Sequence, residues 1–304
     1  MDNHTLTKTK MSLVRRYIRK YYVPALMILP GIALVVFMFF SPIFQTIYLS
    51  FYNWNGIFQT PMTPIGVDNY RQMMIDPAFI ISIRNVGLFL LQGLIIQGPI
   101  AFILALFISN RIRGMRYFKF TFFLPVVIPL TAIAIMWRFI LNPNWGLINP
   151  VIQFFYPSFN NDLLGNPSIA IYSIVMVSAW VYVGLNMVIF SAGMTAIPKE
   201  LYESAEIDGA TGKRQIFSIT IPLLMESIKV YLILMVTGSL RAFDLIFVMS
   251  RGGPNESTMA PAVLMYMRTF IHQRFGYGAA IATFILVVGL IGSVIANRYL
   301  FVRD

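Results

Sequence analysis

The sequence predicts an all-α protein that crosses a membrane six times. Of its 304 residues, 58% are hydrophobic and only 12% are charged, which is about half the charged fraction of a soluble domain. Long stretches carry no charged residue at all, namely residues 21–67, 85–110, 120–137, 163–198 and 275–297. A membrane helix needs roughly 20 apolar residues, so these stretches predict a polytopic membrane protein.

Six apolar segments are long enough to be membrane helices. They are residues 24–51, 86–109, 120–140, 169–196, 222–248 and 276–298. The first follows a basic stretch, as the core of a signal peptide does, but it is much longer than the roughly 7–15 apolar residues of such a core. We therefore expect a basic cytoplasmic tail over residues 1–20, and a six-helix transmembrane domain over residues 21–304 that begins with an uncleaved helix.

Basic residues predict the orientation of the chain. One alternating set of segments is rich in them: Lys8, Lys10, Arg15, Arg16, Arg19, Lys20, then Arg111, Arg113, Arg116, Lys119, then Lys199, Lys213, Arg214, and finally Arg298 and Arg303. Because cytoplasmic loops carry the excess of Lys and Arg, both termini are expected inside, with six spans between them. The net charge of +11 then reflects topology and contact with membrane lipid, and no nucleic-acid partner is expected.

The expected outer loops are rich in turn residues. Pro61 and Pro64 interrupt the first loop, and Gly252-Gly-Pro254 opens the third. The segment Pro261–Arg268 in the third loop is either a solvated connector or a short helix at the membrane interface.

The cytoplasmic segment over residues 198–221 has the pattern of a helix–turn–helix. Pro198 suits the first position of a helix, whose acidic face carries Glu200, Glu203 and Glu206. Asp208-Gly209 is expected to end this helix, because Gly favours a left-handed C-terminal cap. A second helix over residues 213–218 then leads to the next span. Such a rigid protrusion suits docking of a cytoplasmic partner.

This segment resembles the EAA loop of ABC importer permeases. Glu203-Ser-Ala205 is followed after three residues by Gly209, and after nine more by Ile219-Thr-Ile-Pro222. The family pattern is Glu-Ala-Ala, three residues, Gly, nine residues and Ile-x-Leu-Pro, so Ser204 and Ile221 depart from it while the spacing is kept. The resemblance implies a coupling loop that includes Glu203, Ser204, Ala205, Asp208, Gly209, Ala210 and Pro222. Within the dock we expect Glu203 to form an ion pair or a cap, and in the loop itself we expect Asp208 to cap the second helix.

Other stretches resemble permeases of the maltose and glycerol-phosphate type. They include Phe122-Phe-Leu-Pro125, Gly184-Leu-Asn186 and Gly252-Gly-Pro254, and the resemblance covers about residues 20–304. It implies a multi-pass protein of the bacterial cytoplasmic (inner) membrane that imports a sugar or oligosaccharide. It also implies a second permease subunit in a heterodimer, two ATP-binding subunits and an extracytoplasmic solute-binding protein. ATP and Mg²⁺ are then expected on the ATP-binding subunits, with no cofactor on this chain.

Polar residues inside the spans are candidates for a solute path. The fifth span contains Glu226, Lys229, Arg241 and Asp244, and a charge at the centre of a membrane helix costs about 2.5–3.5 kcal/mol. Glu226 and Lys229 are spaced i, i+3, and so are Arg241 and Asp244. The charges therefore either form structural ion pairs or line the solute path. Trp180 and Asn186 in the fourth span suit sugar binding, but Trp180 is alternatively an interface anchor and Asn186 a tie between helices. Tyr182 is interpreted as an ordinary interface anchor.

Two other classes of function fit less well. An ion-coupled secondary transporter needs a relay of acidic or His side chains at mid-membrane, and no such relay is evident. A membrane enzyme needs a catalytic constellation, but the chain has no Cys, only His4 and His272, and no P-loop or nucleophile elbow. The sequence therefore predicts a transport subunit without catalytic or metal-ligating residues, whose ATP is hydrolysed on another chain.

Overall fold

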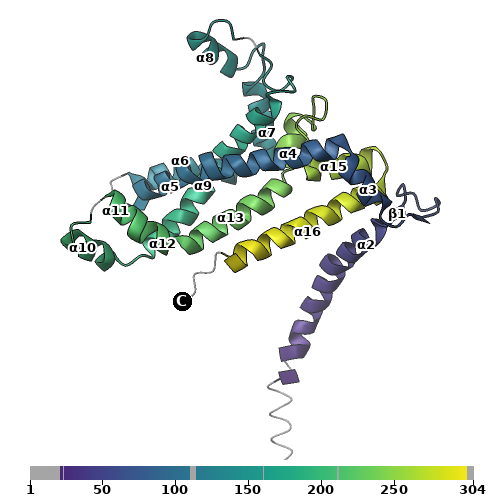
Figure 1. The fold of residues 1–304 in the computed structure, drawn as a ribbon, viewed down its shortest axis with the longest axis horizontal. Coiled ribbons are helices and arrows are strands. Elements are labelled where there is room, and N and C mark those ends of the chain that lie inside the picture. The colour runs from purple at the N-terminus through teal and green to yellow at the C-terminus, as the bar shows by residue number, and fades with distance from the viewer. Residues whose placement is uncertain (1–20, 23, 110–113, 160, 211, 300–304) are drawn as a thin grey trace, which may run out of the picture.

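The computed structural model describes residues 21–22, 24–109, 114–159, 161–210 and 212–299. The predicted basic tail over residues 1–20 lies outside these ranges, as do Arg111, Arg113 and Arg303. The described chain is an elongated bundle of helices, from which the first helix and the α7–α8 segment project (Figure 1).

The described residues contain five helices long and apolar enough to cross a membrane, and six if a bent pair of helices is counted as one span. The spans are Pro24–Leu49, Pro77–Ser109, Met115–Val127 with Leu130–Ile140, Ala170–Thr195, Met225–Met249 and Phe275–Ile295. Each overlaps one predicted segment, so the all-α polytopic fold is confirmed.

The elements are η1 (Val36–Phe40), α2 (Ser41–Leu49), β1 (Tyr52–Asn53), β2 (Thr63–Pro64), α3 (Asp68–Ile75), α4 (Pro77–Gln92), η2 (Gly93–Gln97), α5 (Gly98–Ser109), α6 (Met115–Val127), α7 (Leu130–Ile140), α8 (Ile148–Phe155), α9 (Ala170–Thr195), α10 (Lys199–Ile207), α11 (Lys213–Gln215), η3 (Ile216–Thr220), α12 (Ile221–Leu223), α13 (Met225–Leu240), α14 (Asp244–Met249), α15 (Pro261–Tyr266), η4 (Met267–Ile271) and α16 (Phe275–Tyr299). The η elements are π-helical turns. β1 and β2 form a short antiparallel hairpin.

The second span begins at Pro77, nine residues before the predicted start. The Asp76 side chain accepts a hydrogen bond from the Ala78 N–H at 3.0 Å, and Pro77 occupies the first turn. This is a strong N-terminal signal for a helix. The helix therefore extends past Arg84 beyond the apolar stretch, which hydropathy alone does not predict.

The third span is broken, whereas the sequence analysis predicts one helix over residues 120–140. α6 and α7 are bent by 96°. The cause is Pro129, because the residue before a proline is held out of the helical region, and Ile128 is extended with φ −75° and ψ 135°. α7 therefore leaves the direction of the bundle and carries α8 to one side (Figure 1).

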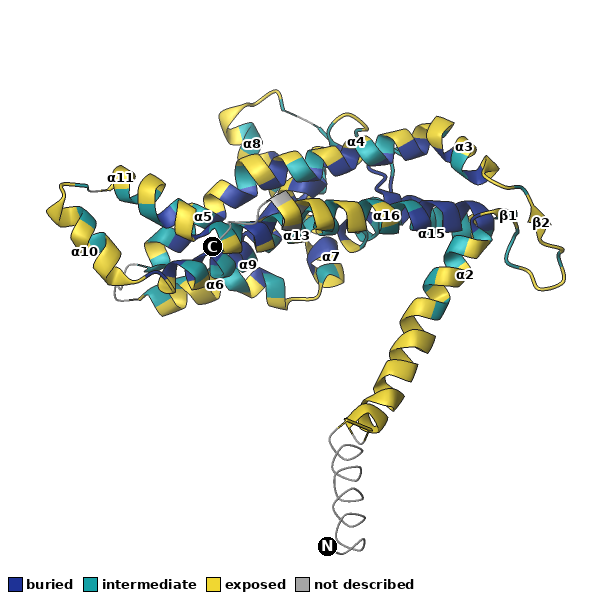
Figure 2. Cartoon of the chain, turned by 60° about the horizontal axis from the view of Figure 1, so that its bottom comes forward, coloured by how far each residue is buried: buried dark blue, intermediate teal, exposed yellow. Residues whose placement is uncertain are grey.

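α9 is the central helix of the bundle. It packs against α5, α6 and α13, and it is buried along most of its length, whereas the first helix is exposed (Figure 2). The buried apolar residues form two clusters. One joins α4, α7, α14, α15 and α16 to the first half of α9, and the other joins α5 and α13 to its second half.

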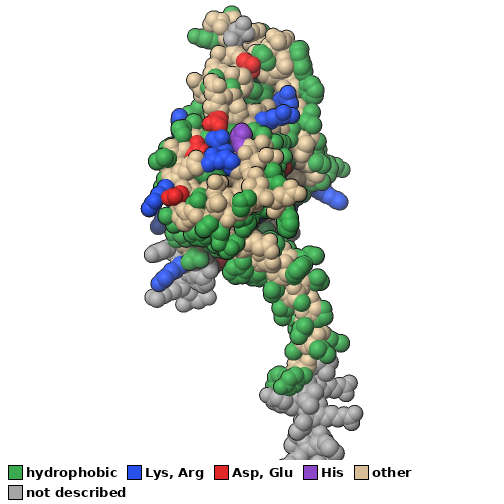
Figure 3. Space-filling view, turned by 90° about the vertical axis from the view of Figure 1, so that its right-hand side faces the viewer, with side chains coloured by type: hydrophobic (Ala, Val, Ile, Leu, Met, Phe, Trp, Pro, Cys, Tyr) green, Lys and Arg blue, Asp and Glu red, His purple; other side chains and the backbone are tan. Residues whose placement is uncertain are grey.

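A polar network ties the loops at the α3–β1 end together. Asp76 accepts hydrogen bonds from the Tyr277 hydroxyl at 2.8 Å and from the Arg268 guanidinium at 3.4 Å. The Asn85 amide donates to the carbonyls of Ser257 and Met259. Charged side chains gather on this end of the molecule, whereas hydrophobic side chains cover the projecting first helix (Figure 3).

The segment Pro261–Arg268 belongs to this end and is helical, as α15 and the start of η4. Pro261, Val263 and Leu264 are buried, and α15 packs against α4 and α16. The solvated connector is therefore wrong and the short helix is confirmed, and this helix packs into the bundle.

Candidate solute cavity and coupling loop

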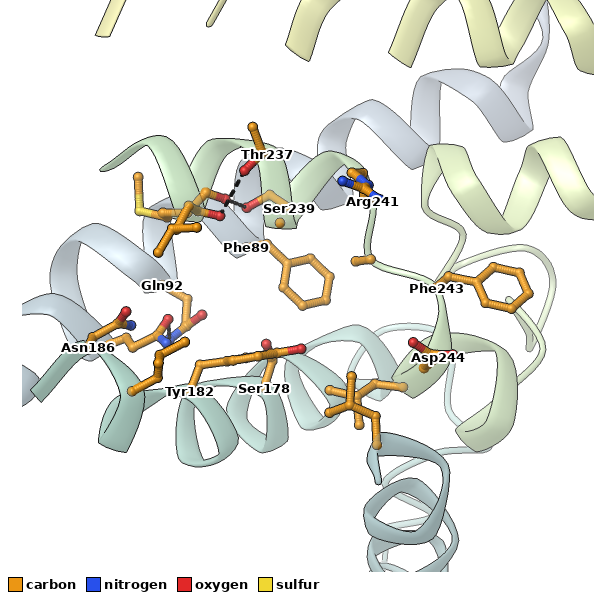
Figure 4. Close-up of a pocket in the computed structure, with 18 of the residues that line it drawn as sticks. Phe89, Gln92, Ser178, Tyr182, Asn186, Thr237, Ser239, Arg241, Phe243 and Asp244 are labelled. Atoms are coloured by element: carbon orange, nitrogen blue, oxygen red, sulfur yellow. Dashed lines mark hydrogen bonds between the residues drawn. The ribbon is translucent and has the colours of Figure 1, made fainter. Parts of the chain in front are cut away.

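A cavity of about 360 Å³ lies inside the bundle where the two apolar clusters meet. Its wall includes Phe89 and Ile246 from the first cluster and Tyr231 from the second. The lining residues come from α4, η2, α9, α13 and α14, together with Leu130 of α7. Figure 4 shows side chains from these elements facing the same space.

The fifth span is interrupted at this cavity. α13 ends at Leu240 and α14 begins at Asp244, so residues 241–243 are not helical. All three line the cavity. Non-helical backbone at membrane depth is tolerated where it is buried in protein or borders an aqueous cavity, which accounts for the position of the break. The expectation of one continuous helix over residues 222–248 is therefore wrong.

Three of the six predicted path residues line the cavity: Asn186, Arg241 and Asp244. Asn186 is buried on α9, while Arg241 and Asp244 are exposed on the two sides of the break (Figure 4). The alternative of an ion pair within one helix turn is wrong for Arg241 and Asp244. The helix is interrupted between them, and the ion pairs found among the described residues do not include either.

The other three candidates lie away from the cavity. Trp180 is 40% exposed and packs edge-on against Trp137, with ring centroids 5.6 Å apart. Glu226 and Lys229 form the predicted i, i+3 ion pair in the first turns of α13. The Lys229 side chain is almost fully buried and the Glu226 side chain is 79% exposed. For this pair the structural alternative is confirmed.

Several uncharged polar residues of the cavity are not among the predicted candidates. They are Gln92, Gln97, Ser178, Thr237 and Ser239. Tyr182 also lines the cavity, so its interpretation as an interface anchor is wrong. The signal that could have found them is an amide or hydroxyl inside an apolar span, since such groups need a partner when buried. The spacing of residues along one helix does not predict which of these groups lie close together in the folded protein, because they come from different helices.

The cavity combines groups that suit a polyhydroxylated solute. Amides and hydroxyls supply both donors and acceptors, and the rings of Phe89, Tyr182 and Phe243 supply flat apolar surface. A few polar groups within a mostly apolar wall are typical of small-molecule sites.

The coupling segment is a helix–turn–helix, as predicted. α10 ends in a Schellman motif, in which the Ala210 N–H bonds to the Ala205 carbonyl at 2.8 Å and the Gly209 N–H bonds to the Glu206 carbonyl at 3.0 Å. Gly209 has φ +76°, in the left-handed region. The predicted role of Gly209 as the helix stop is confirmed.

One expected capping role in this segment is corrected by the structure. Asp208 is the C-cap of α10, and the N-cap of α11 is Gly212, without a side-chain hydrogen bond. Asp208 therefore does not cap the second helix. Glu203 is exposed and takes no part in the ion pairs of the described chain, so its expected ion pair or cap with a docked partner stays a prediction.

Tyr202 holds the two halves of the coupling segment together. Its hydroxyl lies 3.0 Å from the buried Thr220 hydroxyl, and its carbonyl accepts from the Gln215 amide at 3.4 Å. Leu201, Ile207 and Phe217 remain exposed on the outside of the segment. The segment thus has an internal tie and an exposed apolar surface, at the end of the bundle opposite α3 and β1 (Figure 1).

Known proteins with similar sequences align with this chain over nearly its whole length. It is 31% identical over 280 residues to the probable ABC transporter permease protein YurN of Bacillus subtilis, covering 91% of this chain and 95% of the relative. It is 30% identical over 291 residues to the trehalose/maltose transport system permease protein MalF of Thermococcus litoralis, covering 95% of each.

A solved structure has the same fold. The chain of a bacterial ABC transporter that imports the acidic polysaccharide alginate superposes with a TM-score of 0.79 at 22% identity, covering 94% of this chain and 98% of that one. The family of binding-protein-dependent transport system inner membrane components matches residues 97–301. This range includes the break of the fifth span at residues 241–243 and the coupling segment. The chain therefore belongs to this family of multi-pass membrane components and is a non-catalytic transport subunit.

Proposed function

We propose that the chain is the permease subunit of an ATP-driven importer for a sugar or oligosaccharide. The observation that carries the proposal is the cavity of about 360 Å³ at the break of the fifth span, whose amides, hydroxyls and aromatic rings match the groups that bind sugars. The relatives agree in solute class. They include a multiple sugar-binding transport system permease of Streptococcus mutans and a diacetylchitobiose uptake permease of Streptomyces coelicolor.

The proposed partners follow from the two ends of the bundle. An extracytoplasmic solute-binding protein delivers the solute at the α3–β1 end, by analogy with the alginate transporter solved in complex with its periplasmic protein. Two ATP-binding subunits dock on the 198–221 segment and hold ATP and Mg²⁺. A second permease subunit completes the translocation path as a heterodimer.

In the proposed cycle, closure of the ATP-binding subunits moves the coupling segment and opens the cavity to the outside. This cycle requires two conformations of the transporter, one with the cavity closed to the outside and one with it open. A ligand such as ATP shifts the equilibrium between them only if its affinity for the two conformations differs. The Schellman motif and the Tyr202 tie support this role, because a segment that transmits a movement has to be stiff.

The proposal is tested by uptake into proteoliposomes that contain the four membrane-associated subunits, with the binding protein outside. The probes are radiolabelled maltose, trehalose, xylose, arabinose and diacetylchitobiose, the sugars named for relatives. We expect uptake of at least one sugar that requires ATP inside the vesicle and the binding protein outside. Uptake that is driven by a proton or sodium gradient without ATP would instead establish the alternative, an ion-coupled secondary transporter.

A further inference from the structure

The second span contains a widened turn where it borders the cavity. In η2 the Gly98 N–H bonds to the Gly93 carbonyl, five residues back instead of four. Gln92 precedes this turn and Gln97 ends it. Both side chains are buried and line the cavity, and the Gln92 amide nitrogen lies 3.4 Å from the Gln97 amide oxygen.

The widened turn is what brings the two amides to the same side of the helix. Five residues of a regular α-helix turn through about 500°, which would leave Gln92 and Gln97 about 140° apart. A turn closed by an i to i+5 bond rotates less per residue, so both side chains face the cavity. Single π-helical turns of this kind occur often at functional sites.

Tyr231 of α13 contacts the carbonyl that closes this turn, that of Gly93 at its start. Its side chain is buried, and its hydroxyl donates a hydrogen bond of 2.5 Å to the Gly93 carbonyl. That carbonyl already accepts the Gly98 N–H, so both of its lone pairs are used. The neighbouring helix thus stabilises the acceptor that the widened turn depends on.

The two glycines of the turn allow this close approach. A Cβ atom at Gly93 would lie 2.5 Å from the Met235 sulfur, and one at Gly98 would lie 2.9 Å from the Tyr231 hydroxyl oxygen. A side chain at either position would therefore push α13 groups away from the turn.

We propose that Tyr231 is a positioning residue, which holds the widened turn of η2 and thereby aims the Gln92 and Gln97 amides at the solute. Groups that are already oriented do not lose conformational freedom when a ligand binds, so this arrangement favours solute binding in the cavity. The inference rests on the proposed solute path through the cavity and adds the residue that shapes one of its walls.

The absence of cysteine from the sequence makes a direct test possible. Gln92→Cys and Gln97→Cys are introduced singly into the assembled transporter in lipid nanodiscs, with native Tyr231 or with Tyr231→Phe. The rate of modification by a charged methanethiosulfonate reagent is then measured. We expect both cysteines to react in the native background. In Tyr231→Phe we expect the rate at Gln97→Cys to fall about tenfold, while the rate at Gln92→Cys stays within about twofold.

Tyr70→Phe is the matched control, because it also removes a hydroxyl with a short contact, 2.6 Å to the Ser50 hydroxyl, at the α3–β1 end. It should change neither rate. Gly98→Ala, which displaces the Tyr231 hydroxyl by contact, provides a second variant and should reproduce the selective fall at Gln97→Cys. Equal rates in the two backgrounds, or an equal fall at both positions, overturn the positioning role alone. If neither cysteine reacts in the native background, the solute path itself is contradicted and the inference fails with it.

Discussion

Gly209 shows how one residue determines the shape of the coupling segment. It ends α10 with φ +76°, and a Cβ atom there would meet no neighbour within 4 Å. The requirement for glycine is therefore conformational and not steric. An L-residue in the left-handed region costs roughly 1–2 kcal/mol, with Asn tolerated better than Ala.

We predict that Gly209→Ala weakens the coupling segment by about 1–2 kcal/mol, and that Gly209→Asn has a smaller effect. Both variants should stay in the membrane. Co-purification of the ATP-binding subunits should fall in the order native, Asn, Ala. Gly66→Ala is the control, since Gly66 also has a positive φ of 58° and open surroundings, but lies at the other end of the bundle. Native association in Gly209→Ala would exclude a role of the turn in docking.

Among the elements, α3, α4, η4 and α16 are joined through one carboxylate. Asp76 caps α4 and accepts hydrogen bonds from Arg268 and Tyr277. The Asp76 side chain is only 12% exposed and that of Arg268 is 19% exposed, so this ion pair is largely withdrawn from water. Removing one partner of such a pair costs much more than breaking an exposed pair.

Asp76→Ala is accordingly predicted to destabilise the protein by about 2–3 kcal/mol, because Arg268 keeps only the more exposed Glu256 as its carboxylate partner and α4 loses its cap. The measurement is the melting temperature in detergent, followed by tryptophan fluorescence. The matched control is Asp68→Ala, whose ion pair with Arg71 is exposed on both sides, and which should cost less than about 1 kcal/mol. Similar losses in the two variants would show that the network does not stabilise the fold.

At the scale of the whole molecule, the coupling segment and the β1–β2 hairpin lie at opposite ends of the bundle (Figures 1 and 2). The positive-inside rule predicts that the coupling segment is cytoplasmic. Ile207 on α10 is 88% exposed and Phe58 in the hairpin loop is fully exposed, so each end offers an accessible reporter position.

This orientation predicts that, in intact cells, Phe58→Cys reacts with a membrane-impermeant thiol reagent, whereas Ile207→Cys reacts only after the membrane is permeabilised. The parent chain has no cysteine and serves as the blank. The reverse pattern would place the coupling segment outside and contradict the importer proposal.

Much of this architecture follows from local sequence. Apolar stretches are long enough to predict the six spans, and Asp208-Gly209 predicts the end of α10, because hydropathy and turn chemistry are properties of neighbouring residues. The start at Pro77 and the breaks at Ile128 and at residues 241–243 are less visible in the pattern. The residues at the two breaks are few, so the stretch on both sides of each break is still apolar enough as a whole to be interpreted as one helix.

The membrane-spanning helical class, the order of the spans and the turn that ends α10 can all be predicted from the amino-acid sequence, since each depends on composition or on a few adjacent residues. The packing of the helices determines which polar groups share the cavity, because Gln92, Tyr182 and Arg241 come from three different spans. It also determines where helices depart from regular geometry. A widened or broken turn inside a membrane persists when neighbouring groups satisfy its backbone, as Tyr231 does for the carbonyl of Gly93.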